Sequence, residues 1–157
     1  MAVPCRQSAL RFLKVRPRSV AELKNKLERK GFEAQEIETT LQWLINTKLL
    51  NDRSFTKSWI QYRLARPFGF RRIIGELKAK GIADEIIEQT IAQFKEEYIE
   101  GDVILDLAKR RAQRLTGLEP LKRKKRIYDF LIRRGFAVGE VMKVIKKISA
   151  KGGSASG

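Results

Sequence analysis

A pattern of a basic residue, a glycine and a large apolar residue occurs three times in this chain of 157 residues. The copies are Lys30-Gly31-Phe32, Lys80-Gly81-Ile82 and Arg134-Gly135-Phe136. Glycine readily adopts the left-handed conformation just past a helix end, so each copy predicts a Schellman helix stop. In this motif the residue after the glycine packs on the residue five positions before it. The predicted pairs are all apolar: Leu27 with Phe32, Leu77 with Ile82, and Leu131 with Phe136.

An amphipathic helix is predicted after each stop, because apolar residues recur there at i, i+4 and i+7. These residues are Ile37, Leu41 and Leu44, then Ile87, Ile91 and Phe94, then Val141, Ile145 and Ile148. Two helices before each glycine and one after it make a unit of about fifty residues. We predict an all-α fold of three tandem three-helix repeats stacked into an elongated, curved array. The predicted repeats are residues 6–50, 51–97 and 98–149, followed by a disordered tail at 150–157.

Local signals predict other helix ends. Pro17 and Pro67 each end the first helix of a repeat, because proline cannot continue the hydrogen-bond ladder. Ser19 and Glu22 predict a capping box, in which Ser19 caps the second helix and Glu22 reaches back to the backbone of Ser19. Either side chain of Asn51-Asp52 can cap the helix that opens repeat two.

The sequence lacks the residues that most enzymes use. It contains no histidine, which removes the usual near-neutral general base and the commonest metal ligand. It also has no glycine-rich phosphate loop. Asp102 and Asp106 could share a magnesium ion, but such carboxylates on a basic helix are more often ion-pair partners, here of Lys109 or Arg110. We therefore predict a binding protein and not an enzyme, with no cofactor and no metal site.

Cysteine content and hydropathy predict the compartment. The single cysteine, Cys5, excludes an intramolecular disulfide and is typical of a reducing cytosol; we interpret it as an incidental free thiol. No apolar run approaches the roughly 20 residues that a membrane span needs. Residues 1–7 lack the apolar middle of a signal peptide. We predict a cytoplasmic monomer that does not associate with membranes.

Basic residues are in excess, and they are unevenly distributed. The formal net charge is +16, which predicts a polyanionic partner, above all nucleic acid. Residues 101–157 carry 15 basic and 5 acidic side chains, against 10 and 5 in residues 1–50 and 9 and 8 in residues 51–100. If the middle helices of the repeats align, the basic residues form a stripe suited to phosphates or to an acidic protein surface. The candidate binding residues are Arg63, Arg66, Arg71, Arg72, Lys78, Lys80, Lys109, Arg110, Arg111, Arg114, Lys122, Arg123, Lys124, Lys125, Arg126, Arg133 and Arg134.

Four aromatic residues lie near these basic residues in the sequence. Tyr62, Phe68, Phe70 and Tyr128 could stack on nucleic-acid bases. Their helical spacing favours packing in the core instead.

Several segments, in this order along the chain, resemble one known family. They are Ser19-Val20-Ala21-Glu22-Leu23, Lys30-Gly31-Phe32, Leu50-Asn51-Asp52-Arg53-Ser54-Phe55, Trp59-Ile60, Arg63, Gly69-Phe70-Arg71-Arg72-Ile73, Glu76-Leu77, Lys80-Gly81-Ile82, Lys124-Lys125-Arg126 and Leu131-Ile132-Arg133-Arg134-Gly135-Phe136. With these residues the chain resembles the RecX family, the bacterial regulators of the RecA recombinase, over about residues 9–148. It departs from the family pattern at Pro67-Phe68, where polar residues are more usual.

The resemblance implies a modular protein of three three-helix repeats that binds in the groove of the RecA–DNA filament. There it would hinder filament extension and depress ATP hydrolysis, strand exchange and co-protease activity, as part of recombination, DNA repair and the SOS response. The implied partners are the RecA filament and DNA, single- or double-stranded, without sequence specificity.

A tandem helix-turn-helix DNA reader is the alternative from another class, because such units also have three helices. In those proteins the third helix of a unit enters the major groove. Here Glu33, Glu36 and Glu38 begin that helix in repeat one, and acidic residues at 84, 85 and 88 begin it in repeat two. Phosphate would repel both helices, so sequence-specific recognition is the weaker prediction.

Overall fold

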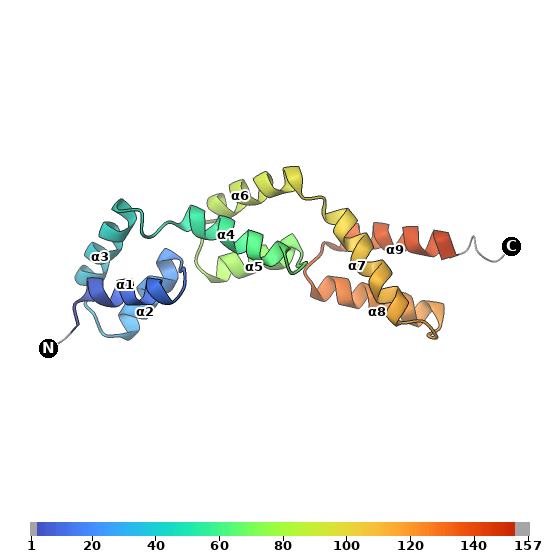
Figure 1. Cartoon of the computed structure of the whole chain (residues 1–157), viewed down its shortest axis with the longest axis horizontal. Helices are drawn as coiled ribbons and strands as arrows, with labels where there is room; N and C mark the ends of the chain where they lie inside the picture. The colour runs from blue at the N-terminus through green and yellow to red at the C-terminus, as the bar shows by residue number, and fades with distance from the viewer. Residues whose placement is uncertain (1–2, 153–157) are drawn as a thin grey trace. The chain divides into compact units, whose positions relative to one another are not determined.

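The computed structural model describes residues 3–152, and the regular secondary structure in this range is entirely helical (Figure 1). The helices are α1 Cys5–Val15, α2 Val20–Arg29, α3 Ala34–Asn46, α4 Asp52–Leu64, α5 Phe70–Ala79, α6 Asp84–Glu97, α7 Glu100–Arg114, α8 Pro120–Arg133 and α9 Val138–Gly152. No described helix is both long and apolar enough to cross a lipid bilayer.

The order of helices confirms the predicted all-α fold of three tandem three-helix repeats. The boundary predicted at residue 50 falls in the α3–α4 linker, and the one at residue 97 falls at the end of α6. The elongated, curved stacking of the repeats stays a prediction. Helix α9 continues to Gly152, so the tail predicted from residue 150 begins inside this helix. Residues 153–157 of that tail lie outside the described residues.

All three predicted glycine stops are present. Gly31, Gly81 and Gly135 have φ of 89°, 74° and 90°, in the left-handed region that favours glycine. Each stop has both Schellman hydrogen bonds. The N–H of the residue after the glycine donates to the carbonyl of the predicted partner five positions earlier, at 3.4 Å for Phe32, 3.2 Å for Ile82 and 3.3 Å for Phe136.

The first and third repeats each have an apolar core to which all three of their helices contribute. In repeat one the buried residues are Cys5, Ala9, Leu23, Leu27, Ile37, Leu41, Leu44 and Leu50. In repeat three they are Ile104, Ala108, Ile127, Leu131, Phe136, Val141, Val144 and Ile145. The predicted free thiol Cys5 is therefore part of a core, with 4 % of its surface exposed. Removing each of these larger side chains from water stabilises the fold by about 1.5 to 3 kcal/mol.

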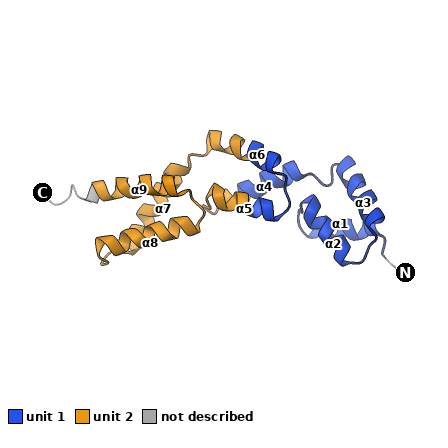
Figure 2. Ribbon diagram, turned by 180° about the vertical axis from the view of Figure 1, so that it is seen from behind, with its two compact units in different colours: residues 1–61, 76–90 blue, residues 62–75, 91–157 orange. Residues whose placement is uncertain are grey.

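Two compact units divide the chain, and they split repeat two between them (Figure 2). The first unit consists of residues 1–61 and 76–90, and the second of residues 62–75 and 91–157. Each unit thus contains one complete terminal repeat together with part of the middle repeat.

Within the first unit, a cluster that we call the Lys80 junction joins repeat one to repeat two. It comprises Ser19, Glu22, Asp52, Lys80 and Gly81. The Ser19 hydroxyl accepts from the Glu22 N–H at 3.1 Å, as predicted for a cap, and donates to the Lys80 carbonyl at 2.6 Å. Asp52 Oδ1 accepts from the N–H of the first residue of α2 at 2.9 Å. One end of α2 is therefore capped by residues from two repeats.

The prediction for Glu22 was wrong. Its carboxylate does not complete a capping box but bridges two cations: Oε2 accepts from Arg16 at 2.7 Å and Oε1 from Lys80 Nζ at 3.0 Å. Burial alone would raise the pKa of Glu22, but the hydrogen bonds from Lys80 and Arg16 hold this pKa below its usual range. Long-range ion pairing outweighs the local capping geometry here.

Within the second unit, the Arg134 junction joins repeat two to repeat three in the same way. It comprises Gly69, Phe70, Glu100, Arg134 and Gly135. The Gly69 N–H donates to the Arg134 carbonyl at 2.9 Å, and Glu100 Oε1 accepts from the Phe70 N–H at 3.2 Å. In both junctions, therefore, the N-terminus of the middle helix of one repeat contacts the glycine stop of the next repeat and is capped by a carboxylate of that repeat.

Candidate anion-binding surface

The second unit contains nearly all of the predicted binding residues. Only Lys78 and Lys80 belong to the first unit. Lys78 Nζ lies 3.9 Å from Asp84 Oδ1. Lys80 is paired with Glu22, and its Nζ lies over the Trp59 ring at 4.3 Å from the ring centroid. The charge of Lys80 is thus compensated inside the protein, so Lys80 is a weaker candidate than the sequence indicated.

An aromatic ring in the α4–α5 loop collects three guanidinium groups. The guanidinium carbon is 4.2 Å from the Phe68 ring centroid for Arg72, 5.0 Å for Arg63 and 5.2 Å for Arg134. Arginine stacked on an aromatic face keeps its N–H groups directed outward at the ring edge, where they can bind an anion. Phe68 therefore organises cations supplied by α4, α5 and the end of α8.

A second ring extends this group into repeat three. Arg134 also lies 5.3 Å from the Phe130 ring centroid, and Arg111 of α7 lies 4.9 Å from the same ring. We call Arg63, Arg72, Arg111 and Arg134, with the two phenylalanines, the arginine cluster. Arg134 is the member that contacts both rings, and its Nη1 donates to the Arg66 carbonyl at 3.0 Å. That hydrogen bond fixes the position of the guanidinium.

Two members of the arginine cluster, Arg111 and Arg134, lack a charged partner among the described residues. Within that part of the chain, the buried Nε of Arg111 also has no hydrogen-bond partner. Guanidinium groups gathered on shared rings repel one another, and a phosphate or carboxylate bound between them would relieve that repulsion. The geometry thus suits an anionic ligand.

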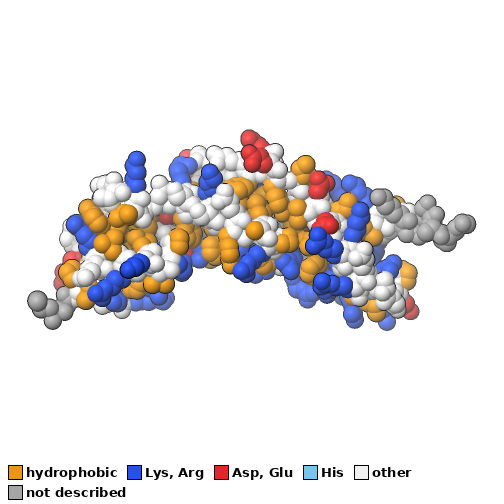
Figure 3. Space-filling view, viewed as in Figure 1, with side chains coloured by type: hydrophobic (Ala, Val, Ile, Leu, Met, Phe, Trp, Pro, Cys, Tyr) orange, Lys and Arg blue, Asp and Glu red, His pale blue; other side chains and the backbone are white. Residues whose placement is uncertain are grey.

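Helix α8 adds a second concentration of charge at its start. We call residues 122–126, which are all lysine or arginine, the α8 basic segment. All but Arg123 are exposed, and blue side chains gather over α8 in Figure 3. Of the basic residues on α8, only Lys125 forms an ion pair within the described chain, with Asp129 at 3.8 Å. This segment can therefore attract a polyanion with little competition from internal partners.

The predicted residues on α7 are mostly exposed. Lys109, Arg110 and Arg114 are exposed, and Arg110 pairs with Asp106 at 3.0 Å. This pair is the ion-pair interpretation of Asp106 that the sequence favoured over a magnesium site. No group of three acidic, cysteine or histidine side chains in the described part of the chain is arranged to hold a metal ion.

The aromatic residues fall into different environments. Phe70 is 4 % exposed, and Tyr128 packs against the core of repeat three, in agreement with the favoured core interpretation. Tyr62 is 48 % exposed, with the Arg66 guanidinium 4.8 Å from its ring centroid. Sequence reasoning did not anticipate that Phe68 and Phe130 organise arginines. The unusual apolar residue at position 68 was the available signal for Phe68.

Comparison with known proteins finds the same family along the whole series of repeats. Family models described as the first, second and third three-helix domains of RecX match residues 5–44, 51–91 and 99–145. Proteins named regulatory protein RecX are similar in sequence. The one from Clostridium beijerinckii is 30 % identical over 148 residues, covering 93 % of this chain and 68 % of the relative. The one from Chlorobium phaeobacteroides is 33 % identical over 141 residues, covering 89 % and 90 %.

Solved structures share the fold. The crystal structure of RecX from Lactobacillus salivarius matches with a TM-score of 0.81 and 22 % sequence identity, over 93 % of this chain and 95 % of that chain. A second crystal structure, of a regulatory protein RecX, matches with a TM-score of 0.77 and 22 % identity, over 91 % and 70 %. At this level of identity the likeness establishes the arrangement of helices.

Proposed function

This chain belongs to the RecX family of regulatory proteins, and from that membership we propose that it regulates the RecA recombinase by binding the RecA–DNA filament. It occupies the groove of the filament, where it blocks filament extension and depresses ATP hydrolysis and strand exchange. It acts by occupancy and without chemistry of its own, in the cytoplasm, where RecA and DNA are found.

The observation that carries this proposal is the concentration of cations in the second unit. The arginine cluster presents guanidinium groups at fixed positions on Phe68 and Phe130, and the α8 basic segment lies on the same unit. A nucleoprotein filament offers both phosphates and acidic protein surface. Fixed guanidiniums bind such groups through paired hydrogen bonds, and the exposed lysines contribute long-range attraction.

The direct test is RecA ATP hydrolysis on single-stranded DNA with increasing amounts of this protein. The wild-type protein is expected to lower the rate. A variant with Lys122, Arg123, Lys124 and Arg126 all changed to Glu should need a concentration higher by at least about tenfold for the same inhibition, because each lost cation weakens polyanion binding.

The matched control changes the same number of cations in the first unit. Arg11, Lys14, Lys24 and Arg29 are exposed and form no ion pair among the described residues. Their replacement by Glu should leave inhibition within about twofold of wild type. Equal losses of inhibition in the two variants would mean that only net charge matters, and would refute the assignment of binding to the second unit. A strong preference for one duplex sequence over random DNA would instead favour the helix-turn-helix alternative.

A further inference from the structure

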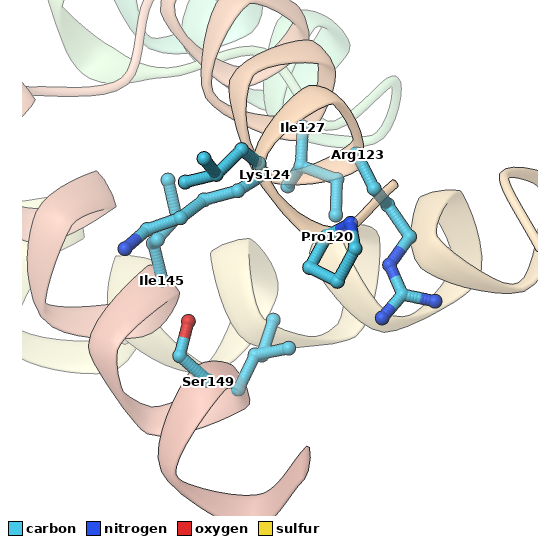
Figure 4. A pocket seen from close by; sticks show the side chains of 8 residues that line it. Pro120, Arg123, Lys124, Ile127, Ile145 and Ser149 are labelled. Carbon is cyan, nitrogen blue, oxygen red and sulfur yellow. The ribbon is translucent and has the colours of Figure 1, made fainter. Parts of the chain in front are cut away.

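Helices α8 and α9 enclose a groove whose apolar floor the proposed function does not use, although its rim is part of the α8 basic segment. Its cavity is about 340 Å³ (Figure 4), within the range of ligand-binding pockets. An adjoining hollow of about 300 Å³ shares three lining residues with it: Leu121, Lys124 and Ile145. The two hollows therefore form one groove along the α8–α9 pair in the second unit.

The floor of the groove is made of aliphatic side chains. Ile127 of α8 lies opposite Ile145 and Ile148 of α9, and Figure 4 shows Ile127 and Ile145 reaching into the space between the two helices. At the edge, Leu121 has 80 % of its surface exposed and Met142 has 39 %. Exposed apolar side chains that lie next to an apolar groove favour burial against a partner.

The rim of the groove is positive. Arg123, Lys124 and Lys125 line it, and no acidic residue lines either hollow. The first turn of α8 has no acidic residue, and its N-cap, Glu119, makes no side-chain capping hydrogen bond. The charge of Glu119 offsets the positive end of the α8 dipole, so the attraction for carboxylates at the rim comes from Arg123, Lys124 and Lys125.

These features together favour an acidic peptide over nucleic acid. Phosphate would satisfy the rim, but a sugar–phosphate backbone gains nothing from burying isoleucine and leucine side chains. The aromatic residue that lines the groove, Tyr128, is partly buried against the core of repeat three, and the larger hollow has no aromatic residue on which a base could stack. An amphipathic helix with apolar residues on one face and carboxylates beside them matches the floor and the rim at once.

We propose that the α8–α9 groove is a docking site for an acidic amphipathic segment of a partner protein. Apolar side chains of the segment cover Leu121 and enter between α8 and α9, and its carboxylates pair with Arg123 and Lys124. The proposal does not depend on RecA being the partner, because the binding can be measured without RecA.

The test uses fluorescence anisotropy of a labelled helical peptide of about 15 residues, with Leu on one face and Glu on the flanks. The full-length wild-type protein should bind it saturably, and a peptide with Gln in place of every Glu should bind much more weakly. Leu121→Glu should weaken binding by at least about tenfold, because a buried leucine contributes that much and the new carboxylate repels the peptide. Lys124→Glu should weaken it as well.

Val15→Glu is the matched control. Val15 is 78 % exposed on α1 and is outside both hollows, so this variant has the same change of charge as Leu121→Glu. Its peptide affinity should stay within about twofold of wild type. Circular dichroism checks that both variants keep their helices.

Three results would overturn the proposal. The first is that the peptide does not bind, or binds equally well to the Leu121→Glu and Lys124→Glu variants. The second is that a labelled single-stranded oligonucleotide, and not the peptide, loses affinity on Leu121→Glu. The third is a wild-type dimer in sedimentation equilibrium that Leu121→Glu dissociates, since the groove would then hold a second copy of this chain. Loss of RecA inhibition with intact peptide binding would concern the proposed function alone.

Discussion

The Lys80 junction and the Arg134 junction use the same acceptor, the carbonyl before a left-handed glycine, but have different charge chemistry. In each, the carbonyl of the residue just before a left-handed glycine accepts a hydrogen bond from the start of another repeat's middle helix. In the first unit the basic residue before the glycine is paired with Glu22 at 3.0 Å. In the second unit Arg134 lies on two phenylalanine rings and forms no ion pair among the described residues.

The difference shows how a repeat protein can separate stability from binding. A shared hydrogen-bonding scheme joins the repeats at both places, so the side chain before the glycine is free to differ. The Lys80 side chain serves the internal ion pair, whereas the Arg134 side chain is available to an external anion. The two capping carboxylates, Asp52 and Glu100, behave alike. Burial raises the pKa of each, although the hydrogen bond from the Val20 or Phe70 N–H acts to lower it.

Gly135→Ala should have the largest effect on stability. The new methyl group would overlap Arg72 Cβ and lie 2.8 Å from the Arg72 backbone nitrogen, at a φ of 90°. Strain and overlap together should lower the free energy of unfolding by about 2 to 4 kcal/mol. Gly31→Ala is the control, because Gly31 has nearly the same φ and, apart from its chain neighbours, no residue within 4 Å of the added carbon. It should cost about 1 to 2 kcal/mol. Equal losses in urea denaturation would contradict the close contact at the Arg134 junction.

Gly69→Ala should have the second-largest effect on stability, and it distinguishes the Arg134 junction from the Lys80 junction. A methyl group there would overlap the Gly135 carbonyl and lie 2.5 Å from the Phe136 nitrogen, so we expect a loss of about 2 kcal/mol. The corresponding residue of the Lys80 junction is Ser19, whose side chain fits and caps α2. Ser19→Ala should therefore lose only the hydrogen bonds, about 1 kcal/mol. A larger loss of unfolding free energy for Ser19→Ala than for Gly69→Ala would contradict the tighter backbone contact at the Arg134 junction.

Glu22→Gln should destabilise the protein by about 0.5 to 1 kcal/mol at neutral pH, because it removes the carboxylate that pairs with Lys80 and Arg16. The pKa of Glu22 is lowered in the folded state. Its stabilising contribution is therefore present above the unfolded pKa, about 4.3, and is lost as pH falls through the lower folded value. Denaturation curves of wild type and variant should converge in this acidic range. A difference that does not depend on pH would exclude the ion pair as its cause.

Glu100→Gln should have the smallest effect and the opposite sign. The amide oxygen can still accept from Phe70 N–H, and the pKa of Glu100 is raised by burial, so the folded state disfavours its ionised form. The variant should be equal to wild type or more stable by up to about 0.5 kcal/mol at neutral pH. The gain should disappear below about pH 4, where the wild-type carboxyl is protonated in both states. Clear destabilisation at neutral pH would show that the charge itself holds the junction.

Local features of the fold could be predicted from the sequence, because short segments determine them. The left-handed glycines and the Ser19 cap follow from a few neighbouring residues. Contacts between distant segments could not be predicted. Asp52 caps α2 from 32 positions away, and Glu22 pairs with a lysine 58 positions away, since both depend on how the repeats pack. The spacing of apolar residues along a helix carries no information on such pairs.

The candidate site was predictable in composition and not in geometry. Counting charges identified the basic residues of repeats two and three, but charge density does not distinguish a paired lysine such as Lys80 from a stacked arginine such as Arg134. Phe130 lies on the apolar face of α8 and packs against the core of repeat three, and helical spacing reports no more than that this face is apolar. That its ring also holds two guanidiniums depends on α7 and on the end of α8.

Parallel titrations of RecA filaments on single-stranded DNA with the Lys80→Met and Arg134→Met proteins test the central claim most directly. Arg134→Met should weaken filament binding by at least about fivefold, because it removes the cation common to both rings of the arginine cluster. Lys80→Met should stay within about twofold of wild type, since the charge of Lys80 is already compensated by Glu22. Equal affinities for the two variants, with both proteins folded by circular dichroism, would contradict the assignment of binding to the second unit.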